Sequence, residues 1–216
     1  MKKVNIFLLT LLCVLCLLIG NANATIIIYD RLEDGSGDVE NVLFNEPGLI
    51  AMGTTVQGIL NQSRSIVDFT GDEQLYTPPG GQARIAAATD MSLSYLKINM
   101  HDTDQAFSKI QFNIDAATDG SVILTFTDQF GNAESGTFPV DGAGQNWFTA
   151  IGFEGQVIAD ATINSVVGSS TTGLADVQQI RIGLGGTTTV PEPSTMLLLG
   201  AGSIGLAAFS RKKLLK

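Results

Sequence analysis

The chain has 216 residues, enough for one domain with short additional segments at its ends. Residues 25–190 contain 20 acidic and six basic side chains, a net charge of −14, and such a surface repels nucleic acid and anionic lipid headgroups. One histidine (His101) and two cysteines (Cys13 and Cys16) exclude metal sites built from several histidines and cysteines.

The first 24 residues have the pattern of a secretory signal peptide. Lys2 and Lys3 precede an almost wholly apolar run, Val4–Ile19, and Ala22-Asn23-Ala24 supplies the small residues that a signal peptidase reads. We therefore expect passage through the secretion machinery and cleavage by signal peptidase after Ala24. That cleavage leaves a mature chain without cysteine. An uncleaved N-terminal anchor is the alternative.

The middle of the chain, residues 25–184, is predicted to be a single all-β ectodomain. Short β-branched and aromatic runs alternate there with Gly, Asn, Asp and Pro, which is typical of strands joined by turns. About eleven strands at this spacing favour an antiparallel β-sandwich, jelly-roll-like in topology. One helical turn is expected at Asn41–Phe44. The expected strands are Thr25–Tyr29, Thr55–Leu60, Ser65–Phe69, Ala83–Ala87, Leu93–Asn99, Phe107–Ile114, Ser121–Thr127, Ser135–Val140, Trp147–Gly152, Val157–Val167 and Val177–Gly183.

Two dipeptides in this region indicate hairpins. In "FNIDAATDGSVILTFTD", Asp119-Gly120 lies between two alternating runs, and such a pair accepts the positive φ of a tight turn. Gly131-Asn132 lies in the same way between the next two runs. We expect each dipeptide to connect two paired antiparallel strands.

The C-terminal segment has three parts in a fixed order, following a polar linker at residues 185–190. The triplet Pro191-Glu192-Pro193 comes first, and its prolines keep it out of a helix. The apolar run Met196–Phe209 would form a helix roughly 21 Å long, whereas a hydrocarbon core is about 30 Å thick. The basic residues Arg211, Lys212 and Lys213 would stop it on the cytoplasmic side. A permanent single-pass anchor and a buried core helix are the alternatives to a processed tail.

The stretch "VPEPSTMLLLGAGSIGLAAFSRKK" resembles the PEP-CTERM sorting signal of Gram-negative bacteria. That signal has Pro-Glu-Pro, an apolar helix and a closing Arg/Lys cluster, and residues 191–216 match each part. The resemblance implies that an exosortase, an integral-membrane protease, is the partner that processes the tail at the inner membrane. It also implies a cell-surface or extracellular protein associated with exopolysaccharide or biofilm. Stretches of the middle region resemble ectodomains of the same family, which are thought to be lectin-like β-sandwiches.

The sequence favours a protein without catalytic residues. His101 in "NMHDTDQ" is the only available imidazole base, and the chain has no Gly-x-Ser-x-Gly nucleophile motif. Paired carboxylates for glycoside cleavage are available among the many acids, so a secreted glycoside hydrolase is kept as an alternative. No cofactor is assigned with certainty.

Calcium is the metal that the composition suits best, because hard cations take carboxylate and carbonyl oxygens from turns. Asp34 and Asp38 lie in the glycine-rich "LEDGSGDVEN", and Asp102 and Asp104 are two residues apart in "HDTDQ". These four residues are the candidate ligands, and solvated turns are the alternative.

A carbohydrate ligand would require an aromatic stacking platform with polar groups around it. Tyr76, just before "TPPG" and expected in an exposed loop, and Trp147 in "GQNWFTAIGF" are the candidates. Either Trp147 or Phe148 is expected to face the core. A calcium-dependent carbohydrate-binding module is therefore the second functional hypothesis, with polysaccharide as its partner.

Overall fold

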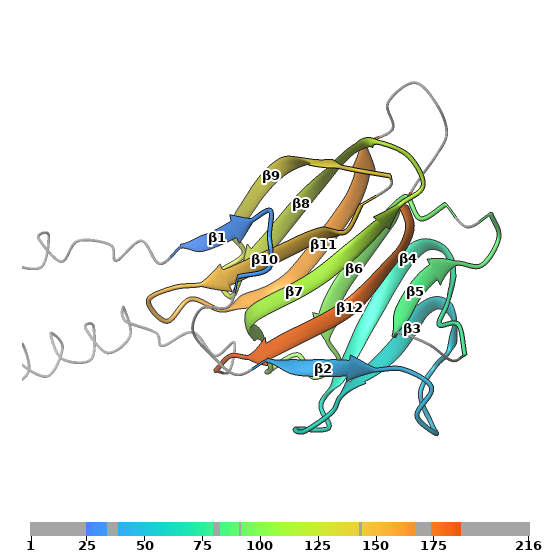
Figure 1. The fold of residues 1–216 in the computed structure, drawn as a ribbon. Helices are drawn as coiled ribbons and strands as arrows, with labels where there is room; N and C mark the ends of the chain where they lie inside the picture. Colours follow the sequence, from blue (N-terminus) through green and yellow to red (C-terminus); the bar gives the residue numbers. More distant parts are fainter. Residues whose placement is uncertain are drawn as a thin grey trace, which may run out of the picture.

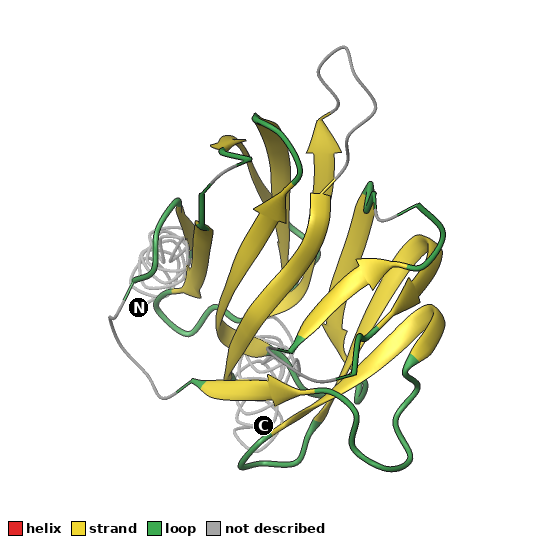
Figure 2. Cartoon of the chain, turned by 45° about the vertical axis from the view of Figure 1, so that its right-hand side comes forward, coloured by secondary structure: helices red, strands yellow, loops and turns green. Residues whose placement is uncertain are grey.

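The computed structural model describes residues 25–33, 39–79, 83–90, 92–142, 144–166 and 174–186. Within these ranges the chain is all β, with no helix (Figures 1 and 2). The strands are β1 (Ile26–Tyr29), β2 (Glu40–Leu43), β3 (Met52–Leu60), β4 (Ile66–Tyr76), β5 (Arg84–Ala87), β6 (Tyr95–Met100), β7 (Phe107–Ala116), β8 (Gly120–Asp128), β9 (Ala133–Val140), β10 (Asn146–Gly152), β11 (Ile158–Val166) and β12 (Leu174–Leu184). The expected C-terminal helix lies outside the described residues.

The strands form two facing layers that pair antiparallel throughout (Figure 1). The first sheet has the order β1-β10-β7-β12, and the second has the order β3-β4-β6-β11-β8-β9. The short strands β2 and β5 each pair with β12 of the first sheet and with one strand of the second. The two sheets are therefore joined along one side, and the predicted antiparallel, jelly-roll-like sandwich is confirmed.

Alternation along each strand builds the core between the sheets. In β8, Val122, Leu124 and Phe126 are buried, whereas Ile123 and Thr125 between them are partly exposed. Side chains on alternate residues point to opposite faces of a strand, so each apolar set lies on the inner face. Burial of this kind removes apolar surface from water and supplies the main driving force for folding. No disulfide contributes to this core, since the described chain has no cysteine.

The expected helical turn at Asn41–Phe44 is wrong, because Glu40–Leu43 is the strand β2. Val42 pairs with Leu60 and is buried, as is Phe44 just after the strand. Pairing with β3 and β12 therefore determines the extended conformation of these four residues, because their own sequence does not specify a strand.

One predicted hairpin is confirmed and the other is wrong. β8 and β9 pair with each other along their length, from Gly120 opposite Val140 to Thr127 opposite Ala133. Gly131 in the turn between them has φ +85°, the positive value that the Gly-Asn dipeptide predicts. β7 and β8, which flank Asp119-Gly120, do not pair with each other. β7 pairs with β10 and β12, and with β11 at the single pair Phe107–Ile158, whereas β8 pairs with β11 and β9. The chain therefore changes sheets at this turn instead of folding back on itself.

Candidate ligand-binding face

Several residues singled out in the sequence lie outside the described part of the chain. These are the sorting motif Pro191–Pro193, the basic cluster Arg211–Lys213, and Asp34 and Asp38 of the first calcium candidate. None of the chain that the structure describes forms a helix of the length and apolarity that a membrane crossing needs.

The second calcium candidate is an exposed turn between β6 and β7. Asp102 and Asp104 are both solvent-exposed, and the Gln105 amide donates to the Asp102 carbonyl at 3.1 Å. Within the described ranges, no three Asp, Glu, His or Cys side chains gather as a metal site would need. Calcium binding stays a prediction.

His101 pairs with a carboxylate on the neighbouring strand β4. Its Nδ1 lies 2.8 Å from Oδ2 of Asp68, and its side chain is half exposed. The hydrogen bond to Asp68, together with the charge of that carboxylate, raises the pKa of His101. The histidine is therefore hydrogen-bonded to Asp68 at the surface and forms an ion pair with it when protonated.

The two aromatic candidates lie in different sheets. Tyr76 is the last residue of β4, pairs with Ala86 of β5 and is half-buried, so its expected place in an exposed loop is wrong. Trp147 is a half-buried residue of β10, and the next residue, Phe148, is the one that enters the core. The expectation that one of Trp147 and Phe148 faces the core is confirmed.

Trp147 belongs to the face of the first sheet that points away from the core, called here the outer face. Part of this face is covered by the crossing segment, Arg31–Glu33, which follows β1. The Thr149 hydroxyl donates to the Arg31 carbonyl at 2.9 Å, and the Glu33 amide donates to the same hydroxyl at 3.1 Å. Lys109 Nζ and Gln111 Nε2 both donate to the Glu33 carbonyl, at 2.6 and 2.8 Å. The buried polar residues under the crossing segment therefore have partners.

Asn113 is the next residue of β7 on the outer face, and its environment differs. It pairs in register with Trp147 of β10 and Gln178 of β12, while Phe112 and Ile114 on either side of it point into the core. Its side chain is fully buried, and neither Oδ1 nor Nδ2 has a hydrogen-bond partner among the described residues. An unpaired buried polar group is unfavourable, so this amide stands out among the polar residues of the sheet.

A buried carboxylate lies on the same face. Asp176 of β12 pairs in register with Asp115 of β7, and its Oδ2 accepts a hydrogen bond from Arg84 at 3.3 Å. Its Oδ1 is buried without a hydrogen-bond partner in the described ranges. Burial raises the pKa of Asp176, and the neighbouring charge of Asp115 raises it further, whereas Arg84 opposes the shift.

Arg181 completes this cluster. Its guanidinium carbon lies 5.5 Å from the centre of the Trp147 ring, a cation–π distance. Arg181 has no carboxylate partner within the described part of the chain, although acids outnumber bases there. Four of the other bases form ion pairs, namely Arg31–Glu33, Arg64–Glu46, Arg84–Asp176 and Lys97–Asp160, and Lys109 is bonded to the Glu33 carbonyl.

A bulge in β12 opens the sheet beside Arg181. Gln179 has φ +55°, and the register with β7 shifts between Gln178 and Arg181. On its other side β12 pairs with β5 before the bulge and with β2 after it. A pocket of about 340 Å³ lies in the gap between β2 and β5, and Arg181 lines it.

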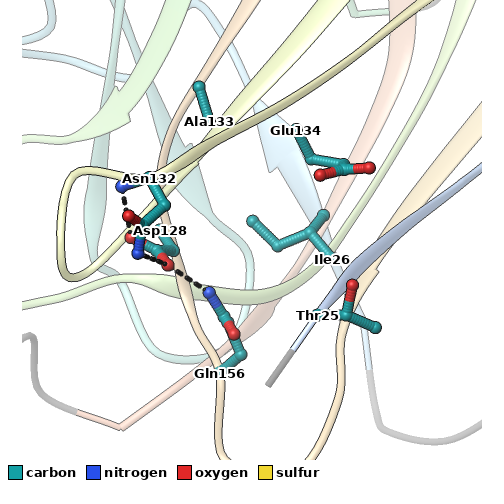
Figure 3. Close-up of a pocket in the computed structure, with 7 residues that line it drawn as sticks. All are labelled: Thr25, Ile26, Asp128, Asn132, Ala133, Glu134 and Gln156. Carbon is teal, nitrogen blue, oxygen red and sulfur yellow. Dashed lines mark hydrogen bonds between the residues drawn. The ribbon is translucent and has the colours of Figure 1, made fainter. Parts of the chain in front are cut away.

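A second pocket lies at the turn of the β8–β9 hairpin, and its lining residues are shown in Figure 3. Its carboxylate, Asp128, is fully engaged: it accepts from the backbone amides of Phe130 and Asn132, from the Asn132 side chain and from Gln156 Nε2. This carboxylate holds the hairpin turn, and it has no unpaired oxygen for a ligand.

Sequence reasoning identified Trp147 but not Asn113, Asp176 or Arg181. One signal was available: β7 reads "FSKIQFNIDA", in which polar residues alternate with buried apolar ones. In a strand at the centre of a sheet, that pattern indicates a polar outer face that is itself covered or bound.

Fold and tail together define the class of the protein, an all-β sandwich followed by a C-terminal sorting sequence. A family model described as the PEP-CTERM protein-sorting motif matches residues 189–212, so the tail carries this sorting motif. This motif supports export and processing by an exosortase, with a cell-surface or extracellular destination. The match covers the tail and not the sandwich. No curated protein matches the chain.

Solved structures with some likeness to the sandwich include two carbohydrate-binding modules and a phage protein. A family 29 carbohydrate-binding module complexed with mannohexaose has a TM-score of 0.30 and 9% identity, covering 71% of this chain and 94% of that one. The module BiXyn10A CBM1 has a TM-score of 0.25 and 10% identity, covering 75% of this chain and 96% of that one. The enzymatically active domain of bacteriophage CBA120 tailspike protein 4 has a TM-score of 0.26 and 20% identity, covering 76% of this chain and 20% of that one. All three scores are below 0.5, so these likenesses carry no argument about ligand or activity.

Proposed function

We propose that the protein is a non-catalytic component of the cell surface or extracellular matrix, processed by an exosortase and associated with exopolysaccharide, as in a biofilm. The observation that carries this proposal is the sorting motif at residues 189–212. A signal peptide at residues 1–24 would bring the sandwich outside the cytoplasm, on the same side of the membrane as Pro191–Pro193. The acidic net charge of residues 25–190 suits a soluble extracellular domain.

Polysaccharide association is supported by the outer face of the first sheet. Trp147 presents an aromatic ring beside the donors of Arg181. Sugar-binding sites combine an apolar platform with a few placed polar groups that orient hydroxyls. Calcium dependence of this binding is proposed through Asp102 and Asp104, and Tyr76 is the other proposed aromatic contact.

Intact-mass analysis of the protein from its native host tests the sorting proposal. We expect a mass that corresponds to loss of residues 1–24 and to a break or a new attachment near Pro191–Pro193. The matched control replaces Pro191, Glu192 and Pro193 by alanine, which should keep the first cleavage and lose the second. An unchanged C-terminal mass beside an active exosortase would contradict the proposal.

A secreted glycoside hydrolase is the second candidate, and one observation favours it. Asp115 and Asp176 are paired in register on the outer face, and the pKa of Asp176 is raised by burial first and by Asp115 second. Glycoside cleavage uses two carboxyl groups of which one stays protonated. Incubation with soluble glycans followed by a reducing-end assay separates the candidates, since release of new ends that Asp176→Asn abolishes would establish hydrolysis.

A further inference from the structure

Three polar atoms without partners mark one region of the outer face. Asn113 contributes Oδ1 and Nδ2, and Asp176 contributes Oδ1, all of them buried and unpaired among the described residues. Asp176 precedes Gln178 by two residues, and Gln178 pairs with Asn113, so all three side chains point to the same side. Neighbouring strands are about 4.8 Å apart and alternate residues about 6.6 Å apart, so one small ligand can reach both residues.

The crossing segment shows why these atoms are not simply an imperfection of the sheet. Two residues before Asn113 in β7, Gln111 is also buried, and its Nε2 donates hydrogen bonds to the Glu33 carbonyl and to the Thr149 hydroxyl. Within the described ranges, the chain supplies partners for the outer face as far as Gln111 but supplies none for the side chain of Asn113. A partner from outside the described fold is the remaining way to satisfy this amide.

The donors and acceptors that are missing define the chemistry of that partner. Oδ1 of Asn113 and Oδ1 of Asp176 are acceptors that need donors, whereas Nδ2 of Asn113 needs an acceptor. A hydroxyl group both donates and accepts, so neighbouring sugar hydroxyls satisfy the whole set. A carboxylate, sulfate or phosphate only accepts, which would leave both oxygens unpaired and place like charges beside Asp176.

We propose that the outer face between Trp147 and Arg181 binds a neutral pyranose residue of a polysaccharide, with Asn113 and Asp176 forming hydrogen bonds to its hydroxyls. This inference rests on the proposed association with polysaccharide and names the ligand class and the residues. The ring of Trp147 packs against the apolar face of the sugar, and Arg181 donates to hydroxyl oxygens at its edge.

A pyranose on this face would have to displace Arg181 from the ring of Trp147. Asn113 is fully buried, so a neighbouring side chain must move before a ligand reaches it. Arg181 can leave with little loss, because it is held by the ring of Trp147 and by no carboxylate of the described chain. Its departure exposes the ring face that the pyranose then occupies. The sugar therefore replaces the guanidinium on the tryptophan.

Calorimetric titration of the exported chain with neutral and acidic hexasaccharides tests the site. We expect cellohexaose, mannohexaose or a galactose hexamer to bind, with a change in Trp147 fluorescence, and alginate hexamers not to bind. Trp147→Ala and Asn113→Leu should each weaken binding at least tenfold, whereas Phe130→Ala, an exposed aromatic residue in the turn between β8 and β9, should leave this affinity unchanged. Asn113→Leu should do so without lowering the melting temperature, which separates a ligand contact from a structural one.

Three results would overturn the inference. They are binding of the acidic hexamer alone, binding of no neutral hexamer, and equal binding of the neutral hexamer by wild type and Asn113→Leu. Intact-mass analysis measures processing of the tail independently of glycan binding. A processed chain that binds no neutral glycan would therefore contradict this site but not the sorting proposal.

Discussion

The buried, unpaired side chain of Asn113 is expected to lower the stability of the fold. Replacing one buried, unpaired polar side chain by an apolar one is expected to raise the free energy of unfolding by about 1–3 kcal/mol. Such a residue is retained at a cost, which is the usual relation between binding sites and stability.

The variant Asn113→Leu should therefore unfold at a higher urea concentration than wild type, by about 1–3 kcal/mol in free energy of unfolding. Gln111→Leu is the matched control on the same strand and face. It removes the bonds to Glu33 and Thr149 and should destabilise the protein. Equal losses in both variants would show that Asn113 has a partner in solution.

Asp176 gives the stability a pH dependence of defined sign. Its pKa is raised in the folded protein by burial first and by Asp115 second. Its contribution to stability is therefore complete below the unfolded carboxyl pKa of about 3.9 and is lost as pH rises through the raised folded value. The charged form is the disfavoured one, and Arg84 opposes this only partly because its side chain is 46% exposed.

Asp176→Asn should accordingly gain stability relative to wild type as pH rises. Urea unfolding at about pH 3.5 and about pH 7, on either side of the expected titration, measures the difference. Asp102→Asn, in the exposed turn, is the control and should show no such trend. A difference that shrinks toward neutral pH would contradict the assignment.

At the scale of elements, most strands were predictable because alternation and burial act locally. β8 and its turn with β9 follow directly from apolar residues at every second position and from Gly131-Asn132. β2 was not predictable, because its four residues become a strand only by pairing with Leu60, Ile59 and β12. The Asp119-Gly120 signal was locally sound, but a turn motif does not specify which sheet receives the next strand.

The β8–β9 hairpin depends on Asp128, which sequence reasoning did not single out. Asp128→Ala should lower the free energy of unfolding by about 2–4 kcal/mol, because it leaves the buried Gln156 side chain and two turn amides without their acceptor. Chemical denaturation measures this loss. Asp119→Ala removes one exposed bond, from the Gly142 amide, and should cost under about 1 kcal/mol. A similar loss in the two variants would exclude the special role of Asp128.

At the scale of the whole molecule, the sequence specifies destination more sharply than ligand. The tail is a contiguous motif, so its order of residues is visible without a structure. The outer face is assembled from β7, β10 and β12, and Asn113, Trp147 and Asp176 meet only through strand register. Trp147 was predictable from its residue type, whereas its neighbours depend on pairings between residues far apart in the chain.

The position of β12 also determines how the molecule would carry mechanical load. β12 ends at Leu184, and the sorting motif begins at residue 189. A polymer bound to the outer face through Trp147, Asn113 and Asp176, together with a cell pulling through the tail, would load the first sheet through β12. Because β12 is bonded to β7 along most of its length, tension directed along it shears many hydrogen bonds at once and does not peel them one by one. The domain would then act as a short tether between matrix and cell, with a rupture force set by the β7–β12 pairing.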